Sequence, residues 1–144
     1  MRILIIFFLF FFSFSQAQES RHEKIRALKT AFITDKLNLT SQEAQKFWPV
    51  YNEFEKQFYE IRSIRGKEVY MVLREQWDDL SDDKANQLID KHLSLEFQEL
   101  RLLKERTEAL RKVIPPKKII RLNKAEEDFK QELLDQYRKR NKEN

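Results

Sequence analysis

The chain has 144 residues, no cysteine and two histidines, and its 28 basic and 24 acidic side chains leave a formal net charge of +4. The lack of cysteine excludes disulfides and thiolate chemistry, and two histidines are too few for most metal sites. Dense but nearly balanced charge is typical of a solvated helical surface, whereas nucleic-acid-binding chains normally carry a concentrated basic excess. The sequence also has no glycine-rich phosphate loop and no nucleophile elbow. We therefore expect no enzymatic activity, no cofactor, no bound metal and no nucleic-acid partner.

Residues 1–17 have the features of a secretory signal peptide. Arg2 provides a positive start, an apolar run follows from Ile3 to Phe12, and Ser15 and Ala17 occupy the small-residue positions before a cleavage point. The apolar run is shorter than the roughly 20 residues that a membrane-spanning helix needs. We expect cleavage after Ala17, export, and no stable membrane insertion afterwards. An uncleaved membrane anchor is the alternative.

The remainder of the chain is predicted to be all-α. It contains one glycine and three prolines, far fewer chain breakers than strand-and-turn folds require. Four helices are expected, over about 21–37, 40–77, 81–114 and 116–138. The predicted organisation is a signal peptide at 1–17, one helical domain at 18–138 and a frayed tail at 139–144.

Cap signals mark the starts of the last three helices. Thr40 with Glu43 three residues later forms a capping box. Ser81 is the predicted cap of the next helix, whose first turn is acidic. Pro115 ends that helix, and Pro116 suits the first position of the last one.

The two middle helices are each predicted to exceed thirty residues, or roughly 50 Å. The short turn between them makes them an antiparallel hairpin. Apolar residues at helical spacing predict the buried faces. They are Phe47, Tyr51, Phe54, Phe58 and Ile61 in the second helix, and Ala85, Ile89, Leu93, Phe97, Leu100, Leu103, Leu110 and Ile114 in the third. Such a thin hairpin should leave apolar surface that a second copy covers or that stays open as a binding groove.

Charge is distributed lengthwise along the hairpin. Residues 75–83 are acidic, and residues 101–121 carry a basic excess. One interpretation is helix-dipole complementation on a solvated face. The other is a field that steers acidic clients or an acidic regulator towards the protein.

Trp48 also has two interpretations. Phe47 and Tyr51 share the predicted core side of their helix, whereas Trp48 lies about 100° away from Phe47. It is either additional core packing or an exposed interaction anchor.

The segment Leu39-Thr40-Ser41-Gln42-Glu43-Ala44 resembles the Leu-Thr-x-x-Gln signature of Spy/CpxP-like periplasmic proteins. Glu43 stands where that signature has glutamine. The segment Ile114-Pro115-Pro116-Lys117-Lys118 occupies the place of the second signature copy, without its threonine and glutamine. The strings 39–53 and 114–120 more closely resemble small exported bacterial proteins labelled "sensor of ECF-type sigma factor".

The resemblance implies a periplasmic, cradle-like antiparallel homodimer. Such a protein binds unfolded or partly folded clients without ATP, or reports envelope stress to a membrane regulator. Candidate contacts of this hairpin combine cationic and apolar side chains that suit loosely held clients. They are Trp48, Phe58, Arg62, Ile64, Arg65, Leu103, Lys104, Arg111 and Lys118. The alternatives are a dedicated regulatory partner of an envelope sensor or anti-sigma system, and a metal-responsive periplasmic protein.

Overall fold

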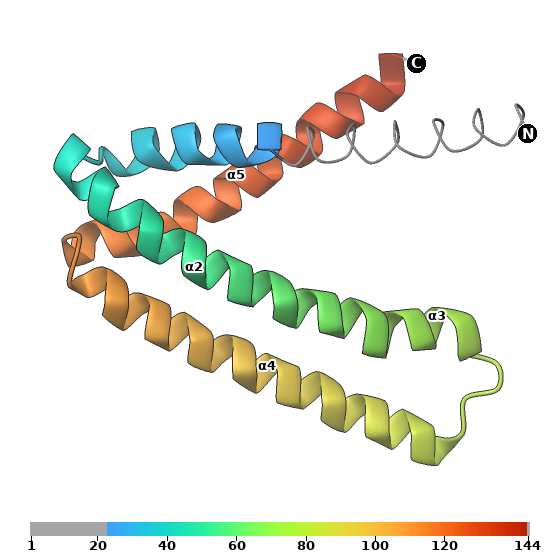
Figure 1. Cartoon of the computed structure of the whole chain (residues 1–144). Coiled ribbons are helices and arrows are strands. Elements are labelled where there is room, and N and C mark those ends of the chain that lie inside the picture. Colours follow the sequence, from blue (N-terminus) through green and yellow to red (C-terminus); the bar gives the residue numbers. More distant parts are fainter. Residues whose placement is uncertain (1–22, 144) are drawn as a thin grey trace, which may run out of the picture. The chain divides into compact units, whose positions relative to one another are not determined.

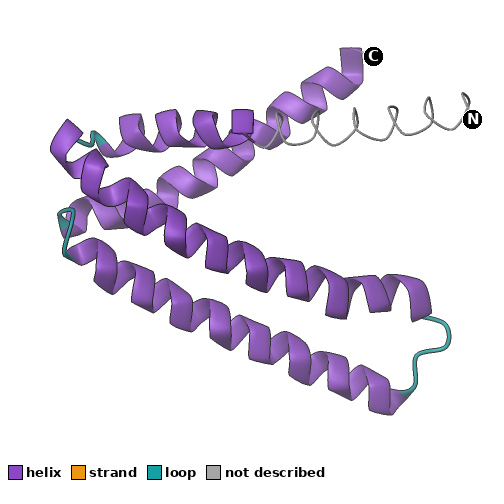
Figure 2. Ribbon diagram, in the orientation of Figure 1, coloured by secondary structure: helices purple, strands orange, loops and turns teal. Residues whose placement is uncertain are grey.

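The computed structural model describes residues 23–143 (Figure 1). The predicted signal peptide, 1–17, lies outside the described residues. In the described part of the chain every regular element is helical and no strand occurs, which confirms the all-α prediction (Figure 2). After a first helix over 23–37, the elements are α2 Ser41–Arg65, the π-helix η1 Gly66–Tyr70, α3 Met71–Gln76, α4 Asp82–Arg111 and α5 Pro116–Glu143.

The chain divides into two compact units. One unit is Thr40–Ile119, which we call the hairpin unit. The other combines the residues up to Leu39 with those from Ile120 onward. The long helix α5 begins in the hairpin unit and continues into the other one.

The hairpin unit is built on two long antiparallel rods. One rod is the continuous run of α2, η1 and α3, and the other is α4, which lies beside it (Figure 1). Both predicted cap residues start their helices. The Thr40 hydroxyl accepts a hydrogen bond from Glu43 N, the Glu43 carboxylate accepts one from Thr40 N, and Ser81 accepts one from Lys84 N. These bonds satisfy amide groups that the first helical turn leaves without partners.

Gly66 begins one wide turn inside the first rod. Its backbone is right-handed helical, and residues 66–70 form a π-helix instead of breaking the rod. A π-helical insertion shifts the helix face that follows it relative to the turns before it. Beyond Gly66 it is Val69, only 3 % exposed, that continues the buried face.

The buried face of α2 was predicted well, but that of α4 was partly wrong. Phe47, Tyr51 and Phe58 are buried as expected. On α4 the buried residues are Leu88, Leu95, Leu102, Arg106 and Leu110, of which the prediction contained only Leu110. Ile89, Leu93, Phe97 and Leu100, predicted to be buried, are 55 %, 50 %, 72 % and 62 % exposed. We call these four residues the α4 outward row.

The error has a physical reason. On α4 the buried leucines Leu88, Leu95 and Leu102 repeat every seven positions. Polar or charged side chains lie on the same side, among them Glu99 and Arg106, whose partners are on α2. The outward row is the denser run of apolar residues, so periodicity alone assigned it to the core.

The second unit contains the first helix and α5 from Ile120. Its buried side chains are Ile33, Leu37, Leu122 and Ala125. The rings of Phe32 and Phe129 pack 5.6 Å apart. Helix α5 extends to Glu143, through most of the segment expected to fray. Among the described residues, no helix has the length and apolar character needed to cross a membrane.

Candidate functional site

The two motif segments meet at one ion pair in the hairpin unit. Lys118 Nζ, in the first turn of α5, lies 2.7 Å from Oε2 of Glu43, in the first turn of α2. The same carboxylate accepts the Thr40 amide at 2.8 Å. The hydrogen bond from Lys118, reinforced by that from the Thr40 backbone, holds the pKa of Glu43 below its ordinary value. Lys118, predicted as a client contact, therefore fastens the start of α5 to the capping box.

Arg106 is the residue of the hairpin that sequence reasoning missed most clearly. It belongs to the basic segment 101–121, yet it is only 5 % exposed. Its guanidinium carbon lies 5.2 Å from the ring centroid of Phe58 and 5.8 Å from that of Tyr51, and Nη1 is 3.8 Å from Glu55. A buried arginine is expected only with such partners. The seven-residue spacing from His92 to Glu99 to Arg106 was the signal that could have placed it.

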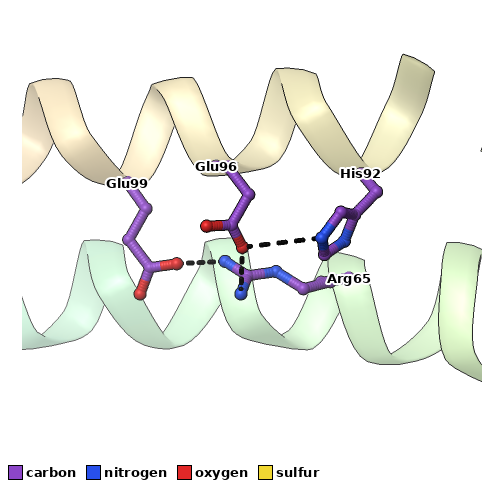
Figure 3. Close-up of polar contacts among 4 residues, drawn as sticks. All are labelled: Arg65, His92, Glu96 and Glu99. Carbon is purple, nitrogen blue, oxygen red and sulfur yellow. Dashed lines mark hydrogen bonds and ion pairs between the residues drawn. The ribbon is translucent and has the colours of Figure 1, made fainter. Parts of the chain in front are cut away.

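Arg65 lies in a second polar layer of the same seam (Figure 3). Its guanidinium is held between two α4 carboxylates, with Nη1 2.8 Å from Glu96 and Nη2 hydrogen-bonded to Glu99. The bond to Glu99 raises the pKa of Arg65 above its ordinary value, so this charge is fixed. His92 Nε2 lies 3.9 Å from the same Glu96 oxygen. Arg65 is thus committed to α4, and it is not an available client contact.

Two atoms beside this layer are left without hydrogen-bond partners. They are Nε of Arg65 and Nδ1 of His92, both shielded from solvent in the described structure. His92 itself is partly exposed, with 38 % of its side chain accessible, and its ring packs 6.2 Å from that of Tyr70. The layer joins α2, η1 and α4 near the π-helical turn. A polar layer in a helical seam fixes the register of the two helices more than it adds stability.

Trp48 packs within its own helix. It is half-buried, and its ring makes edge-on contacts with Phe47 and Tyr51 at centroid distances of 4.9 and 5.3 Å. Phe47 and Tyr51 stack at 5.2 Å. These contacts favour the core-packing interpretation of Trp48 over that of an exposed anchor.

The other predicted contacts divide by exposure. Phe58 is buried under Arg106, so its side chain is not available to a client. Arg62, Ile64, Lys104 and Arg111 are exposed, and Leu103 is half-buried. Arg62 lies over the outer side of the Phe58 ring, with its guanidinium carbon 5.9 Å from the centroid. The Arg62 charge therefore stays at the surface, next to this aromatic ring.

Large exposed apolar residues on α2, η1 and α3 were not predicted as contacts. Tyr59, Tyr70 and Trp77 are 67 %, 52 % and 69 % exposed, and Met71 is 41 % exposed. Trp77 is the C-terminal cap residue of α3, at the end of the first rod, and the acidic turn follows it. Their single signal in the sequence is that they fall outside the stripe of Phe47, Tyr51 and Phe58.

Within residues 23–143, no three histidine, cysteine, aspartate or glutamate side chains gather as a metal site would require. Comparison of the chain with protein-family models, curated proteins and solved structures gave no match. The likeness to Spy/CpxP-like proteins stays a prediction from the sequence.

Proposed function

We propose that the chain is an exported, periplasmic protein that binds unfolded or partly folded client proteins without ATP, in the manner that its resemblance to Spy/CpxP-like proteins implies. The proposal includes the homodimer that the resemblance also implies. It assigns no catalytic residue and no cofactor.

The observation that carries the proposal is the exposure of aromatic side chains along α2, η1 and α3. Tyr59, Tyr70 and Trp77 each expose more than half of their surface. Aromatic side chains contribute large contact areas at protein interfaces, and exposed apolar groups of this size mark binding surfaces. A hairpin only two helices thick has no third layer with which to cover them.

Cationic side chains accompany these aromatic residues. Arg62 is one turn from Tyr59, and Ile64, 38 % exposed, is two residues further on. Clients with apolar and acidic segments would find both kinds of contact on the same stretch of α2. Separate, shallow contacts suit a client that must continue to fold while it is bound.

Suppression of aggregation tests the proposal. A chemically denatured model protein is diluted into buffer with the processed chain at substoichiometric to equimolar ratios, and light scattering is followed. We expect scattering to fall as the ratio rises. The variant Tyr59→Ser/Ile64→Ser/Trp77→Ser should lose most of this effect, whereas Glu53→Ser/Glu60→Ser/Gln76→Ser, with exposed polar residues on the same rod, should keep it.

Two outcomes contradict the proposal, one its function and the other its binding residues. Unchanged scattering at every ratio removes the chaperone function, and equal loss in both variants removes the assignment to these aromatic residues. A pull-down that yields one tight envelope partner, together with no suppression, would favour the dedicated regulator.

A further inference from the structure

The α4 outward row is an uncovered apolar face of the hairpin unit. Ile89, Leu93, Phe97 and Leu100 are each at least half exposed, and they follow one another at spacings of four, four and three. Residues at this spacing lie on one face of a helix. That face points away from the side of the buried leucines Leu88, Leu95 and Leu102.

The spacing continues beyond the apolar centre in both directions. Steps of three and four residues from Leu93 lead back to Asp90 and Asp83, and from Phe97 forward to Lys104 and Arg111. Alternating steps of three and four define the seam of a coiled coil. All four charged residues are exposed. The outward face of α4 is therefore acidic in its first half, apolar at its centre and basic in its second half.

This order of charges along α4 favours a partner with the same charges in the opposite order. We propose that the outward row of α4 pairs with the same row of a second copy of this chain, antiparallel, with Leu93 of each copy against Phe97 of the other. A two-fold axis at this point sets Leu100 opposite Asp90 and Lys104 opposite Asn86. The seam positions from Asp83 to Thr107 then face one another, as a self-complementary two-fold interface requires.

The charges match in this register. Lys104 of one copy lies one turn from both Asp83 and Asp90 of the other. Arg111 reaches past the start of the other copy's α4, which begins at Asp82, and lies about one turn from Asp83. Arg111 has an existing contact with Glu108, 3.8 Å away, but both side chains are more than half exposed. Such surface pairs are weak, so Arg111 can leave Glu108 for a new partner at little cost in free energy.

Other occupants fit this face less well. A parallel pair would set acid against acid and base against base along its whole length. An anionic lipid surface would attract the basic half of α4 and repel the acidic half. The seam from Asp83 to Arg111 spans about 42 Å at 1.5 Å per residue, so like-charge repulsion in a parallel pair would act over many turns.

This assignment deepens the homodimer part of the proposed function and rests on it, but it does not depend on client binding. It is tested by reversing the charges at each end of the seam. One variant is Lys104→Glu/Arg111→Glu, and the other is Asp83→Lys/Asp90→Lys. All four positions are exposed on α4, and circular dichroism of each variant checks that the helices persist.

We expect the unaltered processed chain to sediment as a dimer and each variant alone as a monomer at the same micromolar concentration. The 1:1 mixture of the two variants should return to the dimer mass, because each reversed end then faces its complement. The control pair Gln87→Lys and Glu105→Lys, exposed positions on another side of α4, should leave the dimer intact.

The absence of cysteine from the chain allows a second measurement of the register. Copies carrying Asn86→Cys and copies carrying Lys104→Cys should form a mixed cross-link with a short bifunctional maleimide several-fold faster than Lys104→Cys copies do with themselves. An unaltered chain that is monomeric overturns both the dimer and its interface. A dimer that persists in each reversed variant, or that cross-links best between like positions, overturns the interface alone, and neither result bears on the aggregation assay.

Discussion

Arg106 lies inside the hairpin, over the rings of Tyr51 and Phe58 and close to Glu55. Its charge is held where water cannot solvate it, so its partners are essential to the fold. Removing one member of a buried charged pair leaves the other uncompensated.

We therefore expect Arg106→Ala to lower the free energy of unfolding by about 3 kcal/mol in urea denaturation. The matched change Arg101→Ala, one turn and a half earlier with its side chain 75 % exposed, should cost about 0.5 kcal/mol or less. Equal effects of the two changes would contradict the buried position of Arg106.

Glu43 makes the stability of the hairpin depend on pH. Its pKa is lowered in the folded chain, chiefly by the hydrogen bond from Lys118, so the unfolded chain binds its proton more readily. The stabilisation is present above the ordinary carboxyl value of 4.5 and is lost as the pH falls through the lowered value. Glu43→Gln should thus be less stable than the unaltered chain at pH 6, and in thermal melts the difference should shrink as the pH falls below 4.5. A constant difference across this range would show that the pair with Lys118 does not contribute.

At the scale of the element, α4 carries two apolar rows on different sides. The row of Leu88, Leu95 and Leu102 is buried in the hairpin, and the outward row is exposed. A leucine from each row gives a direct comparison. Leu95→Ala should lower the free energy of unfolding by about 2–4 kcal/mol because it leaves a cavity. Leu93→Ala should change it by less than about 1 kcal/mol, provided that both are measured at a protein concentration low enough to favour single chains.

The helices and their starts could be predicted from the sequence because their signals are local. Thr40, Ser81 and Pro116 determine where helices begin through bonds and backbone angles within one turn. The choice between the two rows of α4 could not be predicted in this way. It depends on Glu55 and Arg65 of α2, which supply partners for Arg106 and Glu99 across the seam.

The same reasoning explains why some candidate contact residues are paired inside the fold and others are exposed. Arg65 and Lys118 looked like available cations because their partners, Glu99 and Glu43, are 34 and 75 residues away in the chain. Arg62, Lys104 and Arg111 are exposed at the surface, and their role as client contacts stays a prediction.

At the scale of the whole molecule, the division of charge along α4 predicts how the proposed dimer responds to salt. Its ends are joined by exposed ion pairs, which mobile ions screen, whereas its centre is apolar. Raising sodium chloride from about 50 mM to 500 mM, which shortens the Debye length from roughly 14 to 4 Å, should increase the dissociation constant several-fold in sedimentation equilibrium. The dissociation constant of the mixed dimer formed by the two charge-reversed variants should rise by a similar factor. A salt-independent dimer would point to a purely apolar interface.

The surface of helix α4 divides into sides with different roles. One side carries the buried leucines, the outward row lies on a side away from it, and Gln87, Ser94, Gln98 and Glu105 lie on a third side. With the outward row paired as proposed, substitutions should be tolerated most readily on that third side. A helix that packs on two sides tolerates few substitutions on either of them.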